Sequence, residues 1–140
     1  MTSDISAGPD AQTDPLRVGV RVSTSIPSPV GHVWEVLISP DGAAALLGQG
    51  AALGGKGEPY HAADGTHGVV RSFHPLQQLR VSWHESPDSP PSLVEIDLVA
   101  EAGGTRVSLL HEHLRDPGQV GDLDLMWSSR LAALGAVSTG

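Results

Sequence analysis

The tripeptide His111-Glu112-His113 is the most suggestive chemical motif in the chain. On a β-strand, residues i and i+2 face the same side, so both imidazoles could converge on a metal ion or carry protons. The motif differs from the His-Glu-x-x-His pattern of helical zinc sites, and no third ligand stands at a characteristic spacing. We therefore predict no metal and no cofactor, and we assign His111 as a candidate polar contact to a bound molecule.

Arg71 is the second candidate, because it alternates with Phe73 along an expected strand. It would then face the same side as Phe73, where it could pair with an anionic group of a ligand or with an acid such as Glu95. A solvated or structurally paired arginine is the alternative. No local nucleophile motif marks a Ser-His-Asp arrangement, so we assign no catalytic residue.

The composition excludes several functional classes. The formal charge is −8, with one lysine and seven scattered arginines, which argues against binding to nucleic acid or to anionic membranes. Cysteine is absent, which excludes disulfides, thiolate metal sites and cysteine nucleophiles. No apolar run approaches the ~18 residues that span a bilayer, and acids stand where a signal peptide would be basic. We expect a cytoplasmic protein.

Alternating and helical patterns predict the elements that position these residues. Residues 1–15 are expected to be a flexible tail, and residues 16–140 a single domain. The pattern predicts strands near residues 17–24, 59–63, 68–74, 79–85, 93–100 and 105–114, a helix over 29–38 capped by Ser28, a short helix ending at Leu47, and a helix over 122–137.

The expected last helix organises the rest of the chain. Its apolar residues fall at helical spacing and form one stripe: Leu123, Met126, Trp127, Leu131 and Leu134. The preceding strands are joined by short turns and should therefore be antiparallel neighbours. The predicted fold class is α+β, with the helices segregated to one face of the sheet.

Several short motifs, taken in order, resemble one known superfamily. Ile26-Pro27-Ser28-Pro29 followed by Val33-Trp34 is similar to the opening signature of START-like (SRPBCC) proteins, and more narrowly of the Hsp90-ATPase-activator-homologue (AHSA1-like) branch. The similarity continues through Asp64-Gly65, Gly68-Val69-Val70, Leu79, Ser82-Trp83, Gly104-Thr105, Leu109, His111-Glu112 and Trp127. The resemblance implies a helix-grip (START/Bet v 1-like) fold: a curved antiparallel sheet of six to seven strands wrapped around a long C-terminal helix, with two short helices after the first strand.

The resemblance implies a ligand cavity between the sheet and the last helix. We predict that it binds a small hydrophobic molecule, with aromatic or polyketide-like compounds as candidates, for transport, sensing, or sequestration in self-resistance. Leu46-Leu47 stands where many relatives carry tryptophan, so the mouth should be aliphatic. The predicted ligand-binding residues are Trp34, Tyr60, Arg71, Phe73, Trp83, Leu109, His111, Met126, Trp127 and Leu131.

Three alternatives to simple ligand binding stay open. The same large residues could fill a solid core instead of lining a cavity. A cyclase- or aromatase-type enzyme would use an acid or base from Arg71, His111 or Tyr60. A chaperone-interaction module like the C-terminal part of the Hsp90 activator is the third, although a fifteen-residue tail cannot supply that protein's additional N-terminal domain.

Overall fold

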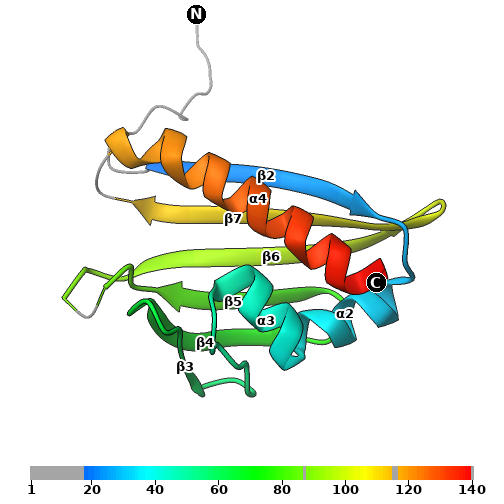
Figure 1. Ribbon diagram of the computed structural model, residues 1–140, viewed down its shortest axis with the longest axis horizontal. Helices are drawn as coiled ribbons and strands as arrows, with labels where there is room; N and C mark the ends of the chain where they lie inside the picture. The colour runs from blue at the N-terminus through cyan, green and yellow to red at the C-terminus, as the bar shows by residue number, and fades with distance from the viewer. Residues whose placement is uncertain (1–17, 87, 115–116, 140) are drawn as a thin grey trace, which may run out of the picture.

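The computed structural model describes residues 18–86, 88–114 and 117–139 (Figure 1). Six strands and three α-helices account for most of them. In chain order they are β2 (Val18–Ile26), α2 (Val30–Ile38), α3 (Pro40–Leu47), β3 (Pro59–His61), β4 (His67–His74), β5 (Gln78–Trp83), β6 (Ser92–Glu101), β7 (Gly104–Leu114), the 3-10 turn η2 (Pro117–Gln119) and α4 (Val120–Thr139). The predicted tail, residues 1–15, lies outside the described residues.

The six strands form one antiparallel sheet in the order β2-β7-β6-β5-β4-β3. Consecutive strands from β3 to β7 are antiparallel neighbours, as the sequence predicts. The first strand, β2, pairs with the last one, β7, so it forms the edge of the sheet opposite β3. The long connection between β2 and β3 contains the helices α2 and α3.

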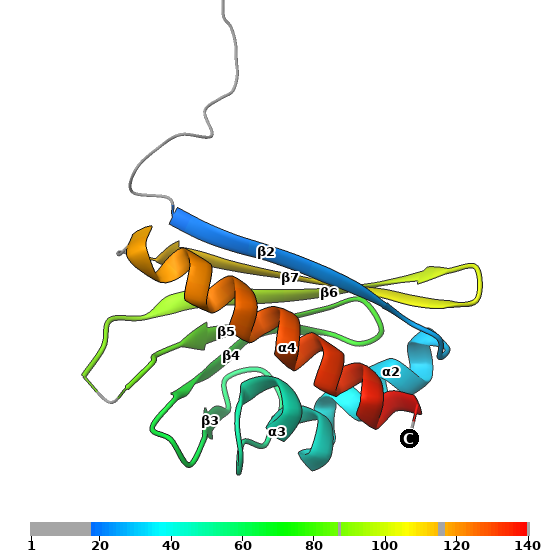
Figure 2. The same ribbon diagram turned by 45° about the horizontal axis from the view of Figure 1, so that its top comes forward.

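All three α-helices cover the same face of the sheet (Figures 1 and 2). The long helix α4 crosses that face diagonally, with its first turns over β2 and β7 and its last turns beside α2. Figure 2 shows the sheet curving beneath α4. The predicted α+β arrangement, with the helices on one face of the sheet, is confirmed. No helix of the described residues is long and apolar enough to cross a membrane.

The core lies between the concave face of the sheet and the helices. Strand alternation sends Val94, Ile96 and Leu98 of β6 inward, and all three are buried. Helix α4 buries its predicted stripe residues Leu123, Trp127, Leu131 and Leu134, whereas Met126 at the edge of the stripe is only partly buried. Apolar burial of this kind supplies most of the driving force for folding.

The start of α2 differs from the sequence prediction. The helix begins at Val30, and Pro29 occupies the N-cap position, where it offers no side-chain hydrogen bond. The Ser28 side chain is buried and donates to the carbonyl of Ser138 at 3.4 Å, which joins the start of α2 to the end of α4. Capping chemistry appears instead at α3, where the Ser39 hydroxyl accepts from the Gly42 N–H at 3.2 Å.

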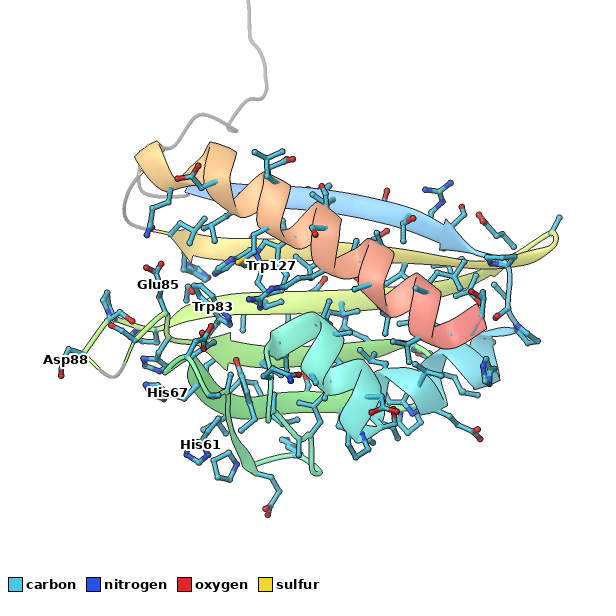
Figure 3. All side chains as sticks on the ribbon, in the orientation of Figure 1. His61, His67, Trp83, Glu85, Asp88 and Trp127 are labelled. Carbon is cyan, nitrogen blue, oxygen red and sulfur yellow. The ribbon has the colours of Figure 1, made fainter. Side chains whose placement is uncertain are left out.

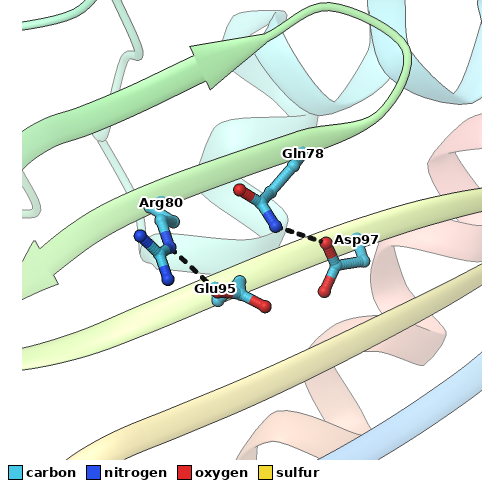
Figure 4. A network of polar contacts seen from close by, with 4 residues as sticks. All are labelled: Gln78, Arg80, Glu95 and Asp97. Atoms are coloured by element: carbon cyan, nitrogen blue, oxygen red, sulfur yellow. Dashed lines mark hydrogen bonds and ion pairs between the residues drawn. The ribbon is translucent and has the colours of Figure 1, made fainter.

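Polar pairs cover the outer face of the sheet. Arg80 of β5 donates to Glu95 of β6 at 2.9 Å, and Gln78 donates to Asp97 at 2.8 Å (Figure 4). These residues are direct cross-strand partners. Arg71 therefore does not pair with Glu95, which the sequence left open as one possibility, because Arg80 of β5 occupies that acid.

Candidate functional site

An open pocket of about 410 Å³ lies between the first half of α4 and the end of the sheet where β5 terminates. Its α4 side is formed by Leu123, Met126 and Arg130, together with Gln119 and Asp122 near the start of the helix. The opposing residues are Asp64 and Thr66 from the β3–β4 turn and Trp83 and Glu85 from the end of β5. Figure 3 shows Trp83 and Glu85 at this end of the sheet, with Trp127 beside them on α4.

The pocket combines an apolar floor with a polar rim. Trp83, Leu123 and Met126 supply the apolar surface, and Trp83, which packs on the Trp127 ring of α4, is only 5% exposed. The rim carries three carboxylates, those of Asp64, Glu85 and Asp122, and one guanidinium. An apolar surface with a few polar groups is the usual design of a small-molecule site.

The guanidinium of Arg130 is held by three neighbours. It donates to the carbonyl of Leu46 at 3.1 Å and lies over the Trp127 ring, 5.5 Å from its centroid. Burial lowers the pKa of Arg130, and the charge of Asp64 opposes that shift. The pKa of Asp64 is lowered mainly by hydrogen bonds from Thr66 and in part by Arg130. The lowered pKa keeps Asp64 charged at neutral pH, and Arg130 is charged because a guanidinium keeps its proton in proteins.

A chain of hydrogen bonds runs beneath the pocket floor. The indole N–H of Trp127 donates to His111 Nδ1 at 3.0 Å. His111 Nε2 lies 2.7 Å from the Ser92 hydroxyl, and that hydroxyl donates to the carbonyl of Trp83 at 3.0 Å. Indole nitrogen can only donate, so His111 Nδ1 must be the acceptor and Nε2 must carry the proton. The chain fixes the tautomer of His111 and ties α4 to β7, β6 and β5.

His111 is neutral in this setting. Its side chain is fully buried, and burial lowers its pKa to about 4. Both ring nitrogens are already occupied by Trp127 and Ser92. The rings of Trp83 and Trp127 enclose it, with centroids 4.8 Å and 5.7 Å away. His111 therefore supports the floor of the pocket from below and has no free nitrogen for a ligand.

Trp83 is the member of this cluster that also lines the pocket. Its indole N–H is buried and has no hydrogen-bond partner among the described residues. Most buried donors in proteins are paired, so this one is unusual.

The structure places all but one of the predicted site residues in two groups. Trp83, His111 and Trp127 form the cluster described above, and only Trp83 and Met126 line the pocket. A second group lies away from the pocket: Leu109, Leu131, Tyr60 and Trp34 are buried in the core, and the partly buried Phe73 packs edge-to-face on Trp34 with ring centroids 5.3 Å apart. Tyr60 donates to the Ser82 carbonyl at 2.5 Å, and burial raises its pKa. Whether these residues contact a ligand stays a prediction.

Arg71 stands apart from both groups. Strand β4 has an irregularity next to it, where inward and outward side chains no longer alternate. The register between β4 and β5 shifts between Val70 and Ser72, which places one extra residue in β4. Val70 and Phe73 therefore both face inward, whereas Arg71 is exposed and lies at a hollow on the outer face. The expectation that Arg71 shares a face with Phe73 is wrong for this reason.

A second bulge separates the two histidines of the opening motif. Between Val20 and Val18 of β2, strand β7 advances three residues, from His111 to Leu114. His113 adopts a left-handed φ of 64° within the bulge and is exposed, whereas His111 is fully buried. The two imidazoles therefore do not converge, and no group of metal-binding side chains occurs among the described residues.

The charged residues at the rim of the pocket were not predicted from the sequence. Asp64, Glu85 and Asp122 come from segments that are distant in the chain, and no spacing links them. Arg130 could have been found, because it lies four residues after Met126 and therefore on the same side of the helix.

No protein-family model matches this chain, and neither does any curated protein. Among solved structures, DynU16, described as a protein in the dynemicin biosynthetic locus, matches with a TM-score of 0.75 and 24% identity over 85% of this chain. CalU16 from Micromonospora echinospora matches with a TM-score of 0.72 and 22% identity over 85% of this chain and 74% of CalU16. The chain has the helix-grip fold. The Aha1 dimer from Colwellia psychrerythraea matches as well, with a TM-score of 0.71 and 15% identity over 84% of this chain and 93% of its own.

These similarities establish the fold and leave activity to be argued from the site. The chain spans less than half of DynU16, since the match covers 46% of that protein. The predicted helix-grip fold is thus confirmed, with a sheet of six strands among the described residues.

Proposed function

We propose that this protein binds a small hydrophobic molecule in the pocket between α4 and the end of β5, for transport, sensing or sequestration. The observation that carries the proposal is the apolar floor of Trp83, Leu123 and Met126 in an open pocket of about 410 Å³. Small-molecule sites in proteins commonly have volumes of about 300 to 1,000 Å³. Large residues predicted to line an inner cavity, such as Leu109 and Leu131, are buried in the core, so we place the ligand in the pocket beside α4.

The rim favours a neutral or cationic ligand over an anionic one. Three carboxylates face the pocket, and the one guanidinium is already engaged by Leu46, Trp127 and Asp64. A carboxylate on the ligand would be repelled, whereas an ammonium group would be attracted.

Binding explains the site better than acid–base catalysis does. Of the three residues considered for catalysis, Arg71 lies at the outer face, and His111 and Tyr60 are buried with their polar atoms engaged. None of the three lines the pocket.

The structural similarity to DynU16 supports a natural product as ligand, because that protein belongs to a biosynthetic locus. Within the superfamily we place the chain in the AHSA1-like branch, on its sequence motifs.

Two matched probes test the proposal: 2-(1-naphthyl)ethylamine, a cation, and 1-naphthylacetate, an anion of similar size. Titrations followed by ¹H–¹⁵N spectra should move the indole signal of Trp83 and the amides of Met126 and Glu85, and the amine should bind more tightly. Saturable shifts confined to other parts of the protein would contradict the proposed site.

A pair of neighbouring variants provides the control. Met126→Gln removes apolar surface from the pocket, whereas Leu125→Gln changes an adjacent residue that is 71% exposed and does not line it. We expect Met126→Gln to weaken amine binding by about 1 kcal/mol, roughly fivefold, from lost apolar contact. Leu125→Gln should bind as the parent does. Equal affinities of the two variants would refute the assignment.

A further inference from the structure

We propose that the outer face of the sheet carries a second site, which binds a small tetrahedral oxyanion such as a phosphate or sulfate group. A hollow of about 410 Å³ lies there, and its polar lining includes Arg71, Ser72, Arg80, Ser82 and His113. It shares no lining residue with the pocket beside α4. The site therefore extends beyond the proposed binding of a hydrophobic molecule.

The charge of this hollow is opposite to that of the protein. The chain has a formal charge of −8 and sixteen acidic residues. Among the described residues, no carboxylate lines the hollow, although two arginines and one histidine do. A cationic hollow on an acidic protein attracts anions locally.

Arg71 brings an unused guanidinium to the hollow. It is exposed and makes no hydrogen bond or ion pair with any described residue. The bulge in β4 places both Arg71 and Ser72 opposite Arg80 of β5. The strand alternates regularly from Gly68 to Arg71, which turns the guanidinium outward, and the bulge then adds Ser72 to the same face.

Arg80 is oriented by its partner on β6. Its Nε donates to Glu95 at 2.9 Å (Figure 4), and none of its other nitrogens hydrogen-bonds to a described residue. The Arg80 side chain is 44% exposed, so its two terminal nitrogens remain accessible. Glu95 offsets one positive charge nearby, and its side chain is 17% exposed and does not line the hollow.

His113 completes the site through its backbone conformation. Its φ of 64° is sparsely populated by residues other than glycine, and such conformations cluster at binding sites. The bulge in β7 turns this side chain away from His111 and toward the hollow. The bulge in β7 thus brings His113, and the bulge in β4 brings Ser72, to the same hollow as Arg71.

These groups match a tetrahedral oxyanion. Guanidinium groups present parallel N–H donors that fit pairs of phosphate or sulfate oxygens, and imidazole and hydroxyl groups add single donors. Either a free inorganic anion or the anionic group of a larger molecule offers this chemistry.

Titration with anions at constant ionic strength tests the inference. Inorganic phosphate, sulfate and phenyl phosphate are added against chloride while ¹H–¹⁵N spectra are recorded. We expect saturable shifts at the amides of Arg71, Ser72, Arg80 and His113. Equal affinities for phosphate and phenyl phosphate would assign the site to a free anion, and tighter binding of phenyl phosphate would assign it to a group on an organic molecule. The absence of saturable shifts in this region would overturn the inference.

Two arginine variants separate a specific site from general charge. Arg71→Ala should weaken anion binding about tenfold, since it removes a charge-assisted donor pair. Arg21→Ala removes the same charge from an exposed outward position of β2 that does not line the hollow, and it should bind anions as the parent does. Equal weakening in both variants would show that only net charge matters and would refute the site. Binding of the naphthyl amine should be unchanged in Arg71→Ala, so failure here is distinct from failure of the α4 pocket.

Discussion

Lowering the pH should destabilise this protein through His111. In an unfolded chain a histidine has a pKa of about 6.5, whereas burial lowers that of His111 to about 4. The unfolded state therefore binds more protons than the folded state between these two values. Stability is unaffected above pH 6.5 and falls as the pH drops from about 6.5 to about 4.

The size of the effect follows from the two pKa values. Each tenfold change in a protonation equilibrium corresponds to about 1.4 kcal/mol, so the whole window corresponds to about 3 kcal/mol. At pH 5.5 the loss relative to pH 7.5 should be about 1.4 kcal/mol, before contributions from other groups. Urea unfolding followed by tryptophan fluorescence measures this difference.

Two histidine variants isolate the contribution of His111. His111→Gln keeps a donor for Ser92 but cannot take up the proton, so its unfolding free energy should vary less over this pH range by about 1 kcal/mol or more. His74→Gln, at an exposed position, is the matched control for the loss of a histidine. Direct ¹⁵N titration of the imidazole should show the Nε2–H tautomer above pH 5. A pKa near 6.5, or the Nδ1–H tautomer, would refute the proposed hydrogen-bond chain.

Two further substitutions test the packing, both by urea unfolding. Tyr60→Phe should cost about 1 to 2 kcal/mol, because the Ser82 carbonyl loses a buried donor, and an unchanged midpoint would show that this bond is not formed in solution. Gly42→Ala should cost about 2 kcal/mol or more, because the new Cβ would overlap the Val36 carbonyl where α2 and α3 meet. Gly31→Ala, which meets nothing within 4 Å, should instead stabilise α2 by about 0.5 to 1 kcal/mol, and equal effects of the two glycine changes would contradict the helix packing.

Periodicity predicted the elements because burial enforces it. Val94, Ile96 and Leu98 must alternate if β6 is to bury one face, and Trp127, Leu131 and Leu134 must recur on one side of α4. Patterns of this kind can be recognised within a short stretch of sequence. Element positions could therefore be predicted to within a few residues at each end.

The bulges could not be predicted in the same way. Arg71 and His113 occur in runs that read as regular strands, and neither run contains a glycine at its bulge; Gly19 lies opposite the bulge in β7, on the partner strand. Each bulge depends on how one strand pairs with its neighbour, which is a tertiary property. Two side chains expected on the concave face consequently lie outside it.

The boundary between core and pocket was also beyond the sequence. Large apolar residues such as Leu109 and Leu131 would suit either a cavity lining or a filled interior, and the choice depends on how volumes fit together in three dimensions. The rim residues could not be predicted either, since Asp64, Glu85 and Asp122 come to the same pocket only when the chain folds.

The hydrogen bond between Trp127 and His111 explains why the pocket lies where it does. Apolar contacts have little directional preference, so leucines alone would allow α4 to rotate on the sheet. A donor that must meet His111 inside the core fixes that rotation, because leaving either group unpaired would cost about 1 to 3 kcal/mol. Successive helical residues are 100° apart, so holding Trp127 inward places Met126 at the edge of the buried stripe, with Arg130 on the same side. Met126 and Arg130 both line the pocket, and the buried hydrogen bond thus determines which side chains of α4 form its wall.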